Sequence, residues 1–150
     1  MKLPDWLFVL INPAVRLLLL SPCHRLLSKS VMLIRFRGRN SGKTFVTPVR
    51  YIRVGPKLIC FTGKENQWWR NMRVPVELVL RAGGVEGPYR VQAIHSDPSK
   101  VKEGLALLLA QFPQDAPYYD IKISRKEGPD LNCLESASYK TAMIECYPVT

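Results

Sequence analysis

The sequence predicts a mainly β protein of the α+β class, with helices at the N-terminus and one helix before the last strand. From Val31 onward, apolar residues alternate with polar ones at the period of a β-strand, and a helical period reappears only in residues 98–112. Short strands joined by glycine turns favour a closed or half-open barrel of about six antiparallel strands, because closing a sheet removes its exposed edges.

Length and composition indicate one domain, residues 1–150. The chain is 47% hydrophobic and 23% charged, which is typical of globular proteins, and its length allows an apolar core without disulfides. The four cysteines include no C-x-x-C, and neither they nor the two histidines have metal-ligand spacing. We therefore expect no metal and a reduced, cytoplasmic protein.

The most apolar segment is residues 6–20. As a helix its 15 residues would reach only about 22 Å, short of a bilayer core of about 30 Å. Pro13 and Arg16 interrupt it, and Arg16 also argues against a secretory signal. We expect two helices here, the second in residues 21–30. Either they pack on the core, or residues 4–20 rest on the inner face of the cell membrane as a peripheral contact.

Period-two alternation and turn residues predict the strands. In chain order, the strands are expected at residues 31–37, 46–54, 57–61, 77–81, 89–95 and 141–147. Gly38–Gly42 and residues 55–56 connect the first three as a meander, and Gly83-Gly84 and Gly87-Pro88 connect the fourth and fifth.

One strongly helical stretch lies before the last strand. Asp97 and Pro98 are typical of a helix start, and Pro113 ends the pattern. Its apolar positions recur at i, i+4, i+7 and i+8: Val101, Leu105, Leu108 and Leu109.

Charge is concentrated in one part of the chain. The sequence has 22 Lys and Arg against 12 Asp and Glu, a net charge of +10. Residues 31–60 contain no acid and seven basic side chains: Arg35, Arg37, Arg39, Lys43, Arg50, Arg53 and Lys57. Such a block favours an anionic partner that carries phosphate, carboxylate or lipid head groups. A solvated basic face is the alternative.

The segment Gly38–Thr44 resembles a phosphate-binding P-loop but has one residue too few between its glycines, and Pro48 would break the helix that must follow. It fits a different anion cradle, in which backbone amides and the side chains of Arg39, Ser41 and Lys43 donate hydrogen bonds. The turn of residues 62–64 adds donors if it lies at the same end of the barrel. An ordinary basic hairpin is the other interpretation.

Two aromatic pairs are candidates for a ring-binding site. Trp68 and Trp69 either pack in the core or lie against a flat ring, with Asn71 fixing the local backbone or a polar ring edge. Tyr118 and Tyr119 follow the predicted helix and are a candidate wall or lid, with a phenol able to give or relay a proton.

Four motifs together resemble the deazaflavin-dependent nitroreductase family, over about residues 10–147. They are Ser21-Pro-x-His24, Gly38-Arg-x-Ser-Gly42, Thr47-Pro-Val-x-Tyr51 and Trp68-Trp-Arg-Asn71. The resemblance implies a split β-barrel of the flavin-reductase type that binds coenzyme F-420, a deazaflavin with a phosphodiester and an oligoglutamate tail. This polyanionic tail would give the basic block a partner.

The resemblance also implies roles for residues. The phosphate and tail would lie along Arg39, Asn40, Ser41, Gly42 and Lys43; the ring would lie beside Thr47, Pro48 and Val49; and Thr62, Gly63, Lys64, Trp68, Trp69 and Asn71 would complete the cofactor site. Tyr118 and Tyr119 would be the catalytic residues near the substrate. Asn40 and Phe45 depart from the family, where basic residues are common, which indicates a weaker hold on the tail or another cofactor such as FMN.

The expected function is that of an oxidoreductase which transfers a hydride from reduced F-420 to an electrophilic acceptor, a quinone or a nitroaromatic. Tyr118, Tyr119 or solvent would supply the proton. The alternatives are a barrel that binds FMN, haem or lipid without hydride-transfer turnover, and a basic nucleic-acid-binding barrel. The last is disfavoured because the tryptophans form one cluster instead of alternating along strands. A monomer and a homodimer both remain open.

Overall fold

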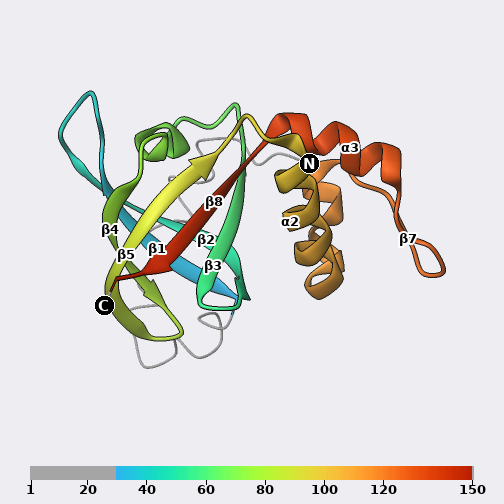
Figure 1. Ribbon diagram of the computed structural model, residues 1–150, viewed down its shortest axis with the longest axis horizontal. Coiled ribbons are helices and arrows are strands. Elements are labelled where there is room, and N and C mark those ends of the chain that lie inside the picture. Colours follow the sequence, from blue (N-terminus) through green and yellow to red (C-terminus); the bar gives the residue numbers. More distant parts are fainter. Residues whose placement is uncertain (1–29, 150) are drawn as a thin grey trace.

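Six antiparallel strands close into a barrel in the order β1-β2-β3-β8-β5-β4 in the computed structural model, which describes residues 30–149 (Figure 1). The barrel strands are β1 (Val31–Arg37), β2 (Thr44–Val54), β3 (Lys57–Gly63), β4 (Val76–Ala82), β5 (Val85–Ile94) and β8 (Thr141–Pro148). The predicted mainly β class and its six strands are confirmed. The predicted N-terminal helices and the membrane contact of residues 4–20 lie outside the described residues.

One predicted turn is wrong. Gly87 and Pro88 lie inside β5, and the turn between β4 and β5 consists of Gly83 and Gly84 alone, both with positive φ. The Pro88 carbonyl accepts a hydrogen bond from the Val149 amide, so this residue points its backbone toward β8. The pairing of β5 with β8 ends next to Pro88, at Tyr89. Because proline has no N–H, one hydrogen bond of the ladder is missing, but only at the end of the sheet.

The chain between β5 and β8 holds more helix than the sequence predicts. The predicted helix is α2 (Pro98–Gln111), with the Asp97 side chain accepting from the Lys100 amide at 3.2 Å. A second helix, α3 (Leu131–Lys140), corrects the expectation of a single helix. The remaining elements are the 3-10 helices η2 (Trp68–Met72) and η3 (Pro113–Tyr119) and a small hairpin of β6 (Ile123–Ser124) and β7 (Gly128–Pro129).

Helix α3 escaped prediction because its apolar stripe is weak. Its buried positions are Leu134, Ala137 and Ser138, and two of these three are small or polar. The signal that remains is Asp130, whose side chain accepts from the Cys133 amide at 2.9 Å and caps the helix. Packing against α2, more than local pattern, stabilises it.

The protein has two apolar layers, one inside the barrel and one outside it. Side chains of β3 contribute to both layers in alternation: Leu58 and Cys60 face the barrel interior, whereas Ile59 and Phe61 face outward. The outer layer lies between the barrel wall and the helices α2, η3 and α3, which gather on one side of the barrel (Figure 1). This arrangement brings η3 beside strands β2 and β3.

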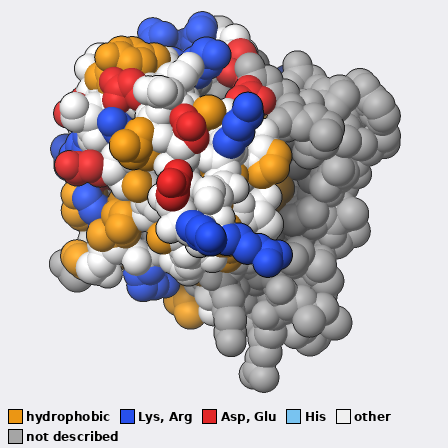
Figure 2. All heavy atoms as spheres, turned by 90° about the vertical axis from the view of Figure 1, so that its right-hand side faces the viewer, with side chains coloured by type: hydrophobic (Ala, Val, Ile, Leu, Met, Phe, Trp, Pro, Cys, Tyr) orange, Lys and Arg blue, Asp and Glu red, His pale blue; other side chains and the backbone are white. Residues whose placement is uncertain are grey.

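The surface of the helical side carries mixed charges. On its described part, Lys and Arg lie among Asp and Glu (Figure 2). The sequence explains this, because residues 91–150 contain six basic and eight acidic side chains. Within residues 30–149, no helix combines the length and the hydrophobicity that crossing a bilayer requires.

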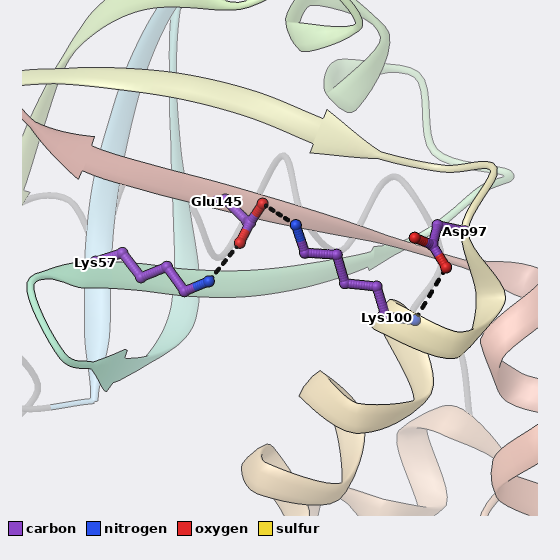
Figure 3. A network of polar contacts seen from close by, with 4 residues as sticks. All are labelled: Lys57, Asp97, Lys100 and Glu145. Atoms are coloured by element: carbon purple, nitrogen blue, oxygen red, sulfur yellow. Dashed lines mark hydrogen bonds and ion pairs between the residues drawn. The ribbon is translucent and has the colours of Figure 1, made fainter.

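A buried carboxylate joins α2 to the barrel (Figure 3). Glu145 on β8 is 4% exposed and accepts hydrogen bonds from Lys57 Nζ at 2.6 Å and Lys100 Nζ at 3.0 Å. Burial by itself raises the pKa of the Glu145 carboxyl, but the hydrogen bonds from both lysines outweigh it and lower the pKa below its usual value. The same contact with Glu145 raises the pKa of Lys57. The network holds the first turn of α2 against β3 and β8.

We predict that Glu145→Gln lowers the free energy of unfolding by about 2 kcal/mol at neutral pH, because both ammonium groups lose a charged acceptor. The folded-state pKa of Glu145 lies below its unfolded value of about 4.3. The stabilisation is therefore complete above that pH and disappears as the pH falls through the folded pKa. Urea unfolding of both proteins at several pH values measures it.

The matched control for this prediction is Glu135→Gln, which removes an exposed pair with Lys102 (2.8 Å) and should change stability by no more than about 0.5 kcal/mol. A difference between the wild type and Glu145→Gln that persists unchanged to about pH 3 contradicts the assignment.

Candidate functional site

The barrel wall is split between β2 and β3. Residues 44–50 of β2 pair with β1, and only residues 51–54 pair with β3, where the register ends at Tyr51 opposite Cys60. Beyond that point β3 continues in register with β8 alone. On a strand paired on one side, every second residue directs its N–H and C=O away from that neighbour. Within residues 30–149 the split therefore leaves backbone groups of both strands without a strand partner, although Pro48 has no N–H to donate.

A hollow of about 300 Å³, which we call the gap hollow, occupies this split. Its lining comes from β2, from the end of β3 and the turn that follows it, and from η3. The lining residues are Thr47, Pro48, Val49, Arg50, Phe61, Thr62, Asn66, Trp68, Gln114, Asp115, Tyr118 and Tyr119. The residues that the sequence analysis placed beside a ring (residues 47–49, Thr62 and Trp68) thus lie together with both candidate catalytic tyrosines.

A second hollow, of about 360 Å³, lies on the tip of the β1–β2 hairpin, and we call it the hairpin hollow. Its lining residues are Phe36, Gly38, Arg39, Asn40, Ser41, Phe45, Gln67, Trp68 and Asn71. Trp68 lines both hollows, so they share this side chain as part of their walls. The candidate phosphate-binding residues 39–41 are therefore next to the candidate ring site, at the end of the barrel where η2 also lies (Figure 1).

Asn71 fastens the hairpin tip to η2. Its Oδ1 accepts from the Arg39 amide at 2.9 Å, and its Nδ2 donates to the Trp68 carbonyl at 2.9 Å. Both ends of this amide are used, so Asn71 fixes the local backbone, one of the two roles that the sequence left open. A contact between residues 32 positions apart also holds the hairpin hollow in shape.

Most amides of the hairpin tip are engaged within the protein. Gly38 N donates to Lys43 O at 2.8 Å, Gly42 N donates to Gly38 O at 2.9 Å, and Lys43 N donates to Ser41 Oγ at 3.3 Å. Gly42 has φ +69, which only glycine adopts without strain, and this closes the turn. An anion at this tip would therefore meet side chains more than a row of backbone amides.

Five predicted residues lie apart from both hollows: Gly42, Lys43, Gly63, Lys64 and Trp69. Trp69 is buried in the barrel interior, where its Nε1 donates to the Lys64 carbonyl at 3.2 Å and its ring lies 5.3 Å from that of His95. Gly63 lines a third hollow, of about 300 Å³, on the far side of the two tyrosines.

An ion pair that sequence reasoning missed holds η3 over the gap hollow. Arg50 Nε lies 2.5 Å from Asp115 Oδ2, and the guanidinium lies 4.4 Å from the Phe112 ring centroid. Arg50 occupies the unspecified position of the Thr47–Tyr51 motif. Its place inside that motif is the signal from which its role in the site could have been predicted. The same reasoning missed Phe61, Asn66 and Gln114, which have no motif of their own.

The two tyrosines form the outer wall of the gap hollow. Their rings meet edge to face at 5.0 Å, and Tyr119 meets Phe61 in the same way at 6.4 Å. Burial, and then the Glu65 charge, raise the pKa of Tyr118, against a hydrogen bond with Asn66. Burial is also the main cause that raises the pKa of Tyr119. Both phenols are therefore protonated at neutral pH.

Comparison with known proteins identifies the fold. No family model and no curated protein matches the chain. A protein of unknown function from Agrobacterium tumefaciens is 15% identical, with a TM-score of 0.56 over 91% of this chain and 54% of its own, so the chain spans about half of that protein.

Two further solved structures have informative names. A putative 5-nitroimidazole antibiotic resistance protein from Bacteroides thetaiotaomicron is 10% identical, with a TM-score of 0.53 over 85% of this chain and 77% of its own. An F-420-H2-dependent reductase is 15% identical, with a TM-score of 0.50 over 77% of this chain and 94% of its own. At these identities the similarity shows the shared split-barrel fold.

We predict that Asn71→Ala loosens the hairpin tip, because the Arg39 amide loses its acceptor and the tip loses its bond to η2. Hydrogen exchange at the Arg39 amide should accelerate by about tenfold, which corresponds to the net value of one hydrogen bond. Asn40→Ala is the matched control, since no hydrogen bond of the Asn40 side chain is found within residues 30–149. Equal exchange at Arg39 in both variants contradicts the role given to Asn71.

Proposed function

We propose that the chain is an oxidoreductase that binds a flavin or deazaflavin ring in the gap hollow and passes a hydride from it to an electrophilic organic acceptor, such as a quinone or a nitroaromatic. The observation that carries the proposal is the split between β2 and β3, which leaves two backbone edges facing a hollow that also contains Trp68 and two protonated phenols. The motif resemblance and the reductase among the solved structures support it.

The donor set of the gap hollow fits such a ring. Flavins and deazaflavins present alternating hydrogen-bond donors and acceptors along one ring edge, and a strand edge presents the same alternation. The apolar faces of Trp68, Val49 and Phe61 suit the flat part of the ring. The bound group would supply the hydride, and the protein would position that group next to the acceptor.

The chain's own residues orient the reactants and keep water away. The η3 segment covers the hollow, and the ion pair of Arg50 with Asp115 holds η3 on β2. A dry, ordered site is the main contribution that a protein makes to the hydride transfer itself, because the hydride passes directly from the bound group to the acceptor.

Proton delivery falls to the tyrosine wall. Reduction of a quinone or a nitro group by a hydride leaves negative charge on an oxygen of the acceptor, and a proton must follow. The Tyr118 phenol, protonated at neutral pH, donates a hydrogen bond to that oxygen and passes the proton, which solvent then restores. Tyr119 is packed between Tyr118 and Phe61 and orients the Tyr118 ring.

Arg39 is the cation placed to hold the anionic side chain of the cofactor. It lines the hairpin hollow, which shares Trp68 with the gap hollow. Coenzyme F-420 and FMN both carry a phosphate beyond the ring, so Arg39 serves either. Asn40 and Phe45 leave this tip with fewer positive charges than an oligoglutamate tail would favour.

Binding is tested by titrating the purified protein separately with F-420 and with FMN, followed by fluorescence. We expect saturable binding of one of them, and we expect Arg39→Ala to weaken it by about tenfold through loss of a charge-assisted hydrogen bond. Arg125→Ala, in the turn between β6 and β7, is the matched control and should leave affinity unchanged. Absence of binding for both cofactors contradicts the proposed function.

Turnover tests the tyrosine. With the reduced cofactor and menadione or a nitroaromatic, Tyr118→Phe should lower kcat by at least about tenfold and leave cofactor affinity unchanged, because only the proton donor is removed. Tyr139→Phe changes an exposed tyrosine of α3 outside both hollows and should retain full activity. A Tyr118→Phe protein with unaltered kcat would show that solvent supplies the proton.

A further inference from the structure

The hairpin hollow has aromatic walls that hydride transfer in the gap hollow does not use. The Phe36 ring stacks with Phe45 at 5.6 Å and 24° and lies against Trp68 at 6.3 Å and 31°. Phe45 and Trp68 make no ring contact with each other in the part of the chain that the structure describes, and both line the hollow. Phe36 is 7% exposed and Phe45 is 46% exposed. The Phe45 and Trp68 rings are both inclined by 31° or less to the Phe36 ring, and Phe36 contacts both, so the hollow is lined by a buried Phe36 ring with Phe45 and Trp68 packed against it.

The walls are held in place before any ligand arrives. A Cβ on Gly38 would lie 2.9 Å from the edge of the Phe45 ring, so the backbone itself packs against this ring. On the other side, Asn71 fixes Trp68 and the hairpin tip together. Because the aromatic side chains of the hairpin hollow are already held in place, little entropy is lost when a flat ring packs against them.

The rim of the hairpin hollow is polar and has one positive charge. The Arg39 guanidinium has no ion pair within residues 30–149, and no acidic side chain lines the hollow. Ser41 Oγ accepts from the Lys43 amide, which leaves its hydroxyl hydrogen free to donate. The side-chain amides of Asn40 and Gln67 offer donors and acceptors at the slot edge.

This combination selects one ligand chemistry. A flexible polyanion gains mainly from positive charges, and Arg39 is the one cation among the lining residues of this hollow. Carboxylates gain no binding energy from aromatic side chains, whereas every heteroaromatic base can stack on them. A single anion attached to a flat, polar-edged ring matches the walls, the amides and Arg39 together.

We propose that the hairpin hollow binds a planar heteroaromatic ring that carries a phosphate, as in a nucleoside monophosphate. The ring stacks against the half-exposed Phe45 ring beside Trp68, the amides of Asn40 and Gln67 bind its polar edge, and Arg39 with Ser41 binds the phosphate. This site shares Arg39 and Trp68 with the proposed cofactor site, so the two ligands would compete for Arg39; it goes beyond the proposed function, because it needs no hydride donor.

The test is isothermal titration calorimetry of the full chain, free of flavin and deazaflavin, with three probes: AMP, adenosine and ribose 5-phosphate. We expect AMP to bind at least about tenfold more tightly than either fragment, since it alone engages both the stack and the cation. AMP binding that is no tighter than that of ribose 5-phosphate overturns the proposal, since charge alone would then explain it.

Variants separate stacking from charge. Phe45→Ala should weaken AMP binding by about tenfold and leave ribose 5-phosphate unchanged, and Tyr139→Ala, another exposed aromatic residue, should alter neither. Phe45→Leu, checked by circular dichroism, keeps the apolar contact with Phe36 and should also weaken AMP binding. If Phe45→Ala binds AMP normally, or if triglutamate displaces AMP at lower concentration than AMP itself requires, the proposal is overturned. AMP has no redox ring, and the Phe45 variants do not alter Arg39, so these results test this site separately from the flavin and deazaflavin titrations.

Discussion

The structure depends on how the eleven residues of β2 divide their pairing between two neighbours. Its first seven residues pair with β1, and its last four pair with β3. The barrel is therefore closed at one end of this strand and split at the other. Because strands satisfy their backbone groups through neighbours, the split leaves polar edges that must meet water, other elements or a ligand. Both hollows lie along or beside this opening.

The elements around the opening hold it in one shape. Arg50 and Asp115 join η3 to β2, Glu145 joins α2 to β3 and β8, and Asn71 joins the hairpin tip to η2. Each contact crosses between elements that are distant in the sequence. These contacts fix the elements around the opening relative to the barrel, which suits a reaction that depends on positioning.

Trp68 and Trp69 show how much of the site could be predicted from the sequence. Trp68 and Trp69 have the same chemistry, yet the 3-10 turn directs one into both hollows and the other into the barrel interior. The strands and α2 were predictable because their patterns are local and periodic. Helix α3 was missed because few of its residues are apolar and buried. A turn was wrongly predicted at Pro88, which a strand tolerates there because the N–H that it lacks lies at the end of the pairing with β8.

The sequence by itself determined the strand pattern, the concentration of positive charge in residues 31–60 and the motifs around Thr47 and Trp68. The tertiary structure alone decided that Tyr118 and Trp68 line one hollow at a split in the wall, and that Phe45 and Trp68 line another. The reason is physical: periodicity reports on neighbours along a chain, whereas a cavity depends on distances between residues many positions apart, and barrel closure sets those distances.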